Sequence, residues 1–252
     1  MILFLFLKWW ILKGVNRMVS NNDGTKHKNG KNPGIKIIVV AFAAILFVIL
    51  SLAAASGMVY VPGLTELMGT DEAVDLGVEV NPVIFDELIE EQGVTLNDPV
   101  SAYTLTSNIQ YSDTSPMDMS LSSSQLSSYL QATNNEGPLK DIQVKLGNNN
   151  QAQMSAYIDL NEMGYNFRGP VYAEGSFEKA DDSSIQVDIS SAKVGLLAIP
   201  ESSTVQGEQE IENLINSHLA KMPGLNIETL EVEDGNLNFK GDFPRTADVV
   251  DV

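Results

Sequence analysis

The chain has 252 residues, no cysteine and a formal net charge of −18. Residues 1–36 carry seven Lys or Arg against one acid, a charge of +6, whereas the remainder carries eight basic and 32 acidic residues, a charge of −24. Disulfides, thiol catalysis and thiolate metal sites are therefore excluded, and the acidic part would be repelled by the phosphates of nucleic acid.

A run of 25 uncharged residues, 37–61, is long enough for one helix to cross a hydrocarbon core of about 30 Å. The basic flank places the N-terminus in the cytoplasm. We therefore predict a single-pass signal anchor: a cytoplasmic tail over 1–36, a transmembrane helix over 37–61 that contacts the lipid bilayer, and an extracytoplasmic remainder. A signal peptide cleaved at Ala53-Ala54-Ala55 is the competing interpretation.

The first 17 residues have two interpretations. MILFLFLKWWIL is too short to span a bilayer, so it is either a segment lying at the membrane surface or the product of a misassigned start codon, with translation beginning at Met18. The exterior part is large enough for one domain and a stalk. A domain of this size without disulfides is more typical of a bacterial cell envelope than of an animal cell surface.

Residues 62–97 are predicted to form an acidic stalk with a short helix over 82–92. Asn81 is a good N-cap, Pro82 suits the first helical position and Gly93 supplies the stop. The apolar face of this helix consists of Ile84, Phe85, Leu88 and Ile89.

The exterior domain is predicted over 98–245. It begins with a strand over 102–110 and a polar loop, followed by a second short helix. Ser122 and Gln125 form a capping box for that helix, and Leu121 with Leu126 can form a hydrophobic staple. We interpret the serines of this segment as capping and solubilising residues, not as a nucleophile, because no histidine or glycine elbow lies nearby in the sequence.

The next 60 residues alternate between apolar and polar side chains and predict an antiparallel meander with one apolar and one wet face. Asn148-Asn149-Asn150 and Asp181-Asp182-Ser183 are its predicted turns. The expected strands cover 142–146, 151–160, 171–178, 185–189 and 194–199.

A long amphipathic helix is predicted over 204–222, with Ile211, Ile215 and Leu219 in its apolar stripe. A hairpin follows, with a bulge near Thr229-Leu230 and a tight turn at Asp234-Gly235. The tail, 246–252, is expected to be loose. These elements predict an α+β fold in which a curved, mostly antiparallel sheet packs on the long helix.

No catalytic or metal site is predicted. His218 is the only histidine of the exterior and falls near the apolar stripe, which favours a core role over a ligand role. The acidic residues are spread over strand exteriors and helix surfaces, and EVEDGNLNFKG lacks the terminal Glu of a calcium loop. We expect that the protein binds no cofactor and no metal, and that it is not an enzyme.

If the long helix lies over the apolar face of the sheet, a groove lined by aliphatic and aromatic side chains remains between them. The alternative is that side chains fill this space completely and form an ordinary core. The candidates for a ligand-binding lining are Val144, Met154, Ile158, Phe177, Val187, Ile215, Leu219, Leu230 and Phe239.

Several segments carry a resemblance: DLGVE, LSSSQLSSYLQ, GPLKDIQVKL, GPVYAEGSFE and LAKMPGLNIETLEVEDGNLNFKGDFP. Together they resemble a group of uncharacterised bacterial single-pass membrane proteins, chiefly of Gram-positive type. The exterior domains of that group are similar to TULIP-like and AsmA-like half-barrels, which implies a sheet wrapped round a long helix that shelters acyl chains. The resemblance covers roughly residues 75–245 and implies no catalytic residue.

We therefore expect a membrane-anchored, non-catalytic module that binds lipid or another amphiphile. The alternative is an envelope scaffolding domain that contacts a protein partner through its acidic outer face or through the helix around Phe85 and Leu88. A third hypothesis is a hydrolase of wall polymer that acts through Asp or Glu.

Overall fold

The computed structural model describes residues 33–103, 107–133, 138–161 and 168–250, with side chains from residue 42 onward. The chain divides into two compact units, Met1–Ile45 and Leu46–Val252. The predictions for the N-terminal cytoplasmic tail and for the start codon fall mainly on residues 1–32, which lie outside the described residues.

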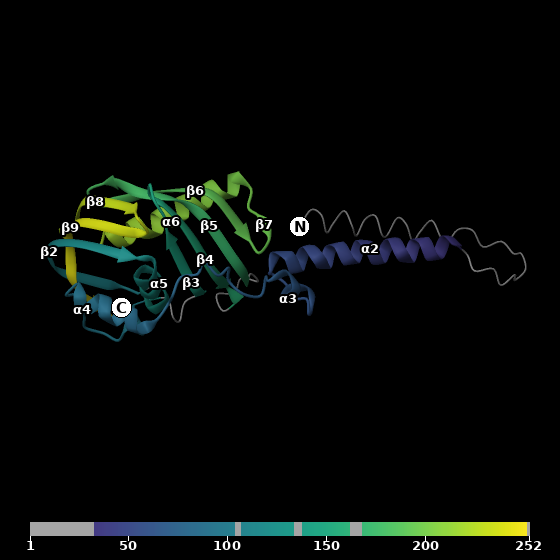
Figure 1. Ribbon diagram of the computed structural model, residues 1–252, viewed down its shortest axis with the longest axis horizontal. Helices are drawn as coiled ribbons and strands as arrows, with labels where there is room; N and C mark the ends of the chain where they lie inside the picture. Colours follow the sequence, from purple (N-terminus) through teal and green to yellow (C-terminus); the bar gives the residue numbers. More distant parts are fainter. Residues whose placement is uncertain (1–32, 104–106, 134–137, 162–167, 251–252) are drawn as a thin grey trace, which may run out of the picture. The chain divides into compact units, whose positions relative to one another are not determined.

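The protein is α+β, with curved, mostly antiparallel sheets and a few helices, as the sequence predicted (Figure 1). Its elements are α2 (Pro33–Ser56), α3 (Leu64–Met68), α4 (Pro82–Glu91), β1 (Thr95–Leu96), η1 (Val100–Ala102), β2 (Ile109–Ser122), α5 (Ser123–Thr133), β3 (Leu139–Leu146), β4 (Gln151–Asp159), β5 (Arg168–Asp181), β6 (Ser184–Val194), β7 (Leu197–Ala198), α6 (Glu201–Leu219), β8 (Asn226–Glu233) and β9 (Asn236–Val249).

Helix α2 ends at Ser56, whereas the sequence predicted a helix as far as Val61. The reason is Gly57, whose φ of 70° takes the backbone out of the helical region. Within the part of the chain that the structure describes, no helix is both long enough and apolar enough to span a bilayer.

The short helices are capped as predicted. The Asn81 side chain accepts a hydrogen bond from Val83 N at the start of α4. At the start of α5, Ser122 N donates to Gln125 Oε1 (2.9 Å) and Gln125 N donates to Ser122 Oγ (3.2 Å), which is the expected capping box.

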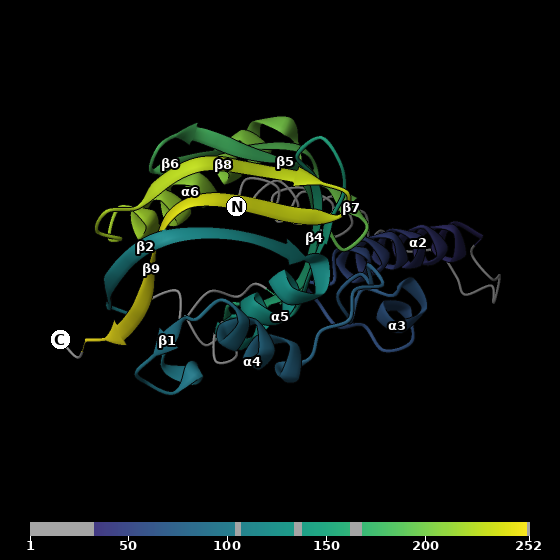
Figure 2. The ribbon, with the colours of Figure 1, turned by 60° about the vertical axis from the view of Figure 1, so that its left-hand side comes forward.

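We call β1, β2, β8 and β9 sheet A, in which β9 is the central strand (Figure 2). On one side β9 pairs with β2 along the whole length of both strands. On its other side β9 pairs first with β8 and then with β1, which runs parallel to it. Pro244 lies where β8 has ended and β1 has not begun, so its missing N–H interrupts no ladder on that side.

Two predictions are wrong in sheet A. The strand expected over 102–110 begins at Ile109 instead, and the expected polar loop is the body of β2, with Asp113 as a positive-φ irregularity (φ 60°) and Pro116 on an edge strand. The tail expected to be loose from residue 246 completes β9 as far as Val249. Both segments are strands because they pair with each other, a long-range contact that local composition does not reveal.

Arg245 on β9 ties helix α4 to sheet A. Its guanidinium donates to Ser115 Oγ (3.1 Å), to Pro116 O (2.6 Å) and to the carbonyl oxygen of Gln92, the C-cap of α4. The arginine therefore satisfies a carbonyl oxygen at a helix C-terminus and another on strand β2 at once.

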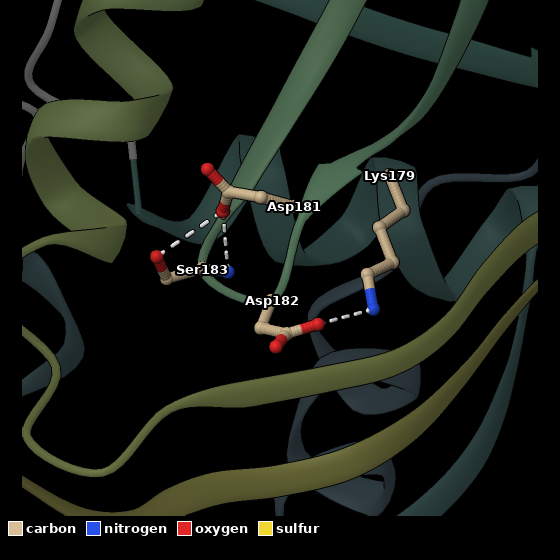
Figure 3. Close-up of polar contacts among 4 residues, drawn as sticks. All are labelled: Lys179, Asp181, Asp182 and Ser183. Atoms are coloured by element: carbon tan, nitrogen blue, oxygen red, sulfur yellow. Dashed lines mark hydrogen bonds and ion pairs between the residues drawn. The ribbon is translucent and has the colours of Figure 1, made fainter.

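We call β3–β7 sheet B, an antiparallel meander in that spatial order. Asn149 and Asn150 have positive φ (54° and 62°) in the β3–β4 turn, as predicted for asparagine. The β5–β6 turn is also where the sequence placed it. There Asp181 accepts from Ser183 N (2.8 Å) and Lys179 pairs with Asp182 at 2.7 Å (Figure 3). The Ser183 N–H holds the pKa of the Asp181 carboxyl below its usual value.

The two sheets meet where these turns reach the outer edge of β8. Ile227 N donates to Asp182 O (2.7 Å), and Asn150 N donates to Val232 O (3.0 Å). Next to these bonds β8 has a bulge between Ile227 and Thr229, close to its predicted position. The turns of sheet B therefore close the edge that β8 would otherwise expose.

The described residues include two clusters of buried apolar side chains. The first contains Met117, Ile227 and Phe239, with Leu219 and Leu230 packed against it. The second joins sheet B to sheet A through Val144, Leu146 and Val232, and is extended by Leu126, Leu130, Met154, Phe177 and Leu237.

The acidic segment 62–80, predicted as a stalk, is held against the domain. Gln143 Oε1 on β3 accepts from Leu76 N at 2.8 Å and from Val78 N at 3.4 Å. At the end of this segment, Asn81 N donates to Ser128 Oγ on α5 at 3.1 Å. These bonds fix the path of the segment from α3 to α4.

Candidate functional site

Helix α6 lies beside β6 (Figure 1). Three of its polar side chains hydrogen-bond to the backbone of β6 along the edge that does not pair with β5. Glu208 Oε1 accepts from Ile189 N at 2.8 Å, and Glu212 Oε1 accepts from Val187 N at 2.7 Å. Asn216 accepts from Ile185 N at 2.9 Å and donates to Ile185 O at 3.0 Å. Residues four apart on a helix line up on one face, so they meet alternate residues of a strand.

Helix α5 makes the same kind of hydrogen bond to the opposite edge of sheet B, which is strand β3. Ser123 Oγ accepts from Leu146 N (3.0 Å), Ser127 Oγ accepts from Val144 N (2.8 Å), and Gln131 Oε1 accepts from Ile142 N (3.0 Å). Ser127 is fully buried. Two of the serines interpreted as solubilising residues are therefore structural partners of β3.

We call these sets of side chains the α5 ladder (Ser123, Ser127, Gln131) and the α6 ladder (Glu208, Glu212, Asn216). They satisfy backbone donors that an edge strand would otherwise present to other chains. Sequence reasoning missed both, although polar residues at i, i+4 and i+8 beside an apolar stripe were the available signal.

The α6 ladder corrects the predicted position of the long helix. The helix was expected to lie over the apolar face of sheet B, but its polar ladder points at the edge of β6. Helix α6 also runs over Glu201–Leu219 instead of 204–222. Along it, Val205, Ile211 and Leu214 are exposed, at 45%, 40% and 41%.

The nine side chains predicted to line a groove fall into three sets. Leu219, Leu230 and Phe239 belong to the first core cluster, and Val144, Met154 and Phe177 belong to the second. The other three, Ile158, Val187 and Ile215, are partly buried and belong to neither cluster. The structure thus gathers six of the nine into its two cores and leaves three on partly open apolar surface.

Two shallow hollows lie elsewhere, and none of those nine residues lines them. One, of about 500 Å³, lies between the start of β2 and residues 220–223, and contains Tyr111. Burial raises the pKa of Tyr111 to about 12. The other, of about 450 Å³, lies between α4 and residues 94–100. The lining of the first is largely polar, which does not suit an acyl chain.

His218 lies on α6, where its Nδ1 donates to Leu214 O at 2.9 Å and its Nε2 is buried without a partner. The described residues contain no group of three His, Asp or Glu side chains that could hold a metal ion. His218 thus makes a helical contact of its own and stands apart from the carboxylates of the α6 ladder.

The helix around Phe85 and Leu88, considered above as a partner-binding surface, is already occupied. Phe85 is 2% exposed and Leu88 is 5% exposed. The Phe85 ring stacks on Tyr129 of α5, with centroids 6.2 Å apart. These side chains hold α4 on α5 and are not available to another protein.

The end of α2 is built into the folded domain. Ala54 is fully buried, and its carbonyl oxygen accepts from Thr70 Oγ1 at 2.5 Å. The next carbonyl, that of Ala55, accepts from Leu196 N at 2.7 Å in the β6–β7 turn. Gly195 there has a φ of 58°, and a Cβ on it would lie 2.2 Å from Ala55 O.

Two more glycines complete this contact. A Cβ on Gly57 would lie 2.6 Å from Pro170 Cδ, and one on Gly169 would lie 3.1 Å from Ser56 O. We call the helix end with Gly57, Gly169 and Gly195 the helix socket. A side chain at Gly57 or Gly195 would clash with its neighbours, and one at Gly169 would be tightly packed. The last turn of α2 is therefore closely packed on the domain.

Comparison with known proteins returned no match to a family model, to a curated protein or to a solved structure.

Proposed function

We propose that this chain is a membrane-anchored, non-catalytic envelope module, and that it binds lipid or another amphiphile on the apolar face of sheet B. The proposal has two parts, an anchor and a ligand-binding face, which rest on different observations. No chemical step is assigned to the domain.

The anchor part is supported by the surface of α2. All six large apolar side chains from Leu46 to Leu52 are exposed, between 39% and 61%. A helix that is apolar on every side needs either a protein core or a bilayer around it. The sequence continues this apolar run back to Ile37 and precedes it with a basic segment, which is the charge order of a cytoplasmic N-terminus.

The helix socket supports an anchor that stays attached. Cleavage at Ala53-Ala54-Ala55 would break the chain inside a buried contact and remove carbonyls that accept from Thr70 and Leu196. These bonds favour the uncleaved alternative. They also join the last turn of α2 to the domain without a long flexible linker.

The ligand part is carried by one observation: α6 lies at the edge of sheet B and not over its apolar face. Ile158 on β4 and Val187 on β6 are therefore only partly buried, and neither belongs to a core cluster. Ile211 and Leu214 add exposed apolar surface on the helix beside β6. Covering such a surface with an acyl chain would lower the free energy of a domain that is otherwise exposed to water.

Native mass spectrometry of the full-length protein, extracted from its host in mild detergent, tests this proposal. We expect a population with added lipid mass. Ile158→Glu places a charge on the apolar face and should remove that mass, whereas Gln186→Glu, at an exposed position of the same sheet, should retain it. Circular dichroism must show that both variants are folded.

A lipid-free wild type would contradict the ligand part. Equal lipid occupancy in both variants would show that the lipid belongs to α2 alone. If the lipid-free protein instead cross-links to one dominant envelope protein in cells, the scaffolding alternative would replace this proposal, with the acidic outer face as its contact surface.

A further inference from the structure

Exposed apolar side chains lie close to the helix socket along the chain. Three side chains directly after α2 are exposed: Met58 (41%), Val59 (51%) and Tyr60 (47%). Leu67 on α3 is 81% exposed, and Leu196 and Leu197 in the β6–β7 turn are 59% and 39% exposed. Together we call these six residues the collar.

The collar comes from two segments about 130 residues apart in the chain, and the socket brings them together. Leu196 N donates to Ala55 O (2.7 Å), and Thr70 Oγ1 donates to Ala54 O (2.5 Å). Segment 58–70 is folded back on itself, because Val61 N donates to Thr65 Oγ1 at 2.8 Å and Thr65 is buried. Every part of the collar is thus within a few residues of a bond to the last turn of α2.

The collar also differs in charge from the rest of the exterior. Residues 37–252 contain 32 acids, yet 57–70 contain only Glu66 and no base. The Glu66 carboxylate accepts hydrogen bonds from the Tyr60 hydroxyl and from Gly63 N, so it has two donors without water. A weakly charged apolar surface in a domain of net charge −24 needs a different environment from the remaining surface.

We propose that the collar sits in the interfacial layer of the bilayer that α2 enters, so that the domain is seated on the membrane in one orientation. This inference rests on the membrane anchor proposed above. The occupant is lipid because the exposed apolar side chains of α2 run as far as Leu52, and the helix ends at Ser56, only two residues before Met58. Tyrosine and large apolar side chains at the exit of a membrane helix prefer the headgroup boundary.

The missing cysteines make a direct test possible. Single cysteines at Val59→Cys and Leu196→Cys, labelled with an environment-sensitive NBD fluorophore, report on the two halves of the collar in full-length protein reconstituted in phosphatidylcholine vesicles. Val48→Cys reports on α2, and Asn149→Cys, in the β3–β4 turn, is the exposed control. Brominated lipids with bromine at different acyl positions supply the depth scale.

We expect blue-shifted emission at Val59 and Leu196 and quenching by shallow bromines, about 5–10 Å into the headgroup and acyl boundary. Val48 should be quenched by deep bromines and Asn149 by none. Quenching at Val48 with water-exposed collar labels would overturn the collar while leaving the anchor. No quenching at Val48 would overturn both. Blue-shifted but unquenched collar labels would mean that protein covers the collar, which also overturns the inference.

Discussion

Replacing Ser127 by alanine tests the α5 ladder at its most buried side chain. The Ser127 hydroxyl accepts from Val144 N at 2.8 Å and lies 3.3 Å from Val144 O, and the side chain is fully buried. Ser127→Ala removes this partner without opening a large cavity. The amide of Val144 then has no acceptor on that side of the β3 edge.

The expected cost follows from that unpaired donor. Leaving a buried N–H without an acceptor costs about 1–3 kcal/mol, and the higher helix propensity of alanine returns roughly 0.5 kcal/mol. The net loss of about 0.5–2.5 kcal/mol should lower Tm by roughly 1–10 °C in a domain of this size.

The matched control is Ser124→Ala, three residues before Ser127 on α5 and outside the ladder, which gains helix propensity and loses no bond to the edge of β3. Thermal unfolding of the two full-length variants, followed by circular dichroism in the same detergent, gives the comparison. Equal Tm values for Ser127→Ala and Ser124→Ala would refute the ladder as the reason why the edge of β3 is stable.

Three further predictions concern other contacts. Gly195→Ala should lower Tm, because a left-handed backbone costs about 1–2 kcal/mol with a side chain and the Cβ would strike the helix socket, whereas Gly207→Ala, in open space on α6, should raise it. Arg245→Ala should cost about 1.5–3 kcal/mol in urea unfolding, whereas Lys240→Ala, in an exposed ion pair of 3.6 Å, should cost less than about 1 kcal/mol. The pKa of Tyr111 is raised to about 12 in the folded state. The unfolded chain therefore releases this proton first, and stability should fall between pH 10 and 12 less steeply in Tyr111→Phe than in the wild type. An equal Tm, an equal free energy of unfolding or an equal pH dependence of stability within one of these pairs would contradict the role given to that contact.

Local patterns predicted most of the elements, because the physical cause was local. Asn81 and the Ser122–Gln125 box start their helices where capping chemistry requires, and the asparagines of the β3–β4 turn adopt the left-handed backbone that they tolerate. The alternation in β3–β6 likewise fixed the meander. In each case the deciding interaction joins residues a few positions apart.

What sequence reasoning missed depends on partners far along the chain. The segment around Asp113 and Pro116 is typical of a loop, and becomes a strand only because β9 pairs with it. Helix α6 has an apolar stripe that predicts a helix lying on a sheet, but the bonds from Glu212 and Asn216 to β6 decide its place at the edge. Periodicity identifies the faces of a helix and not which of them meets the sheet.

The measurement that tests the proposed ligand site most directly is photo-cross-linking with a diazirine-bearing fatty acid. Full-length protein is labelled in membranes, digested and mapped by mass spectrometry. We predict adducts on peptides from β4 and β6, at or beside Ile158 and Val187, in addition to adducts on α2. Adducts confined to α2, with none on sheet B, would contradict the proposal that this module binds an amphiphile.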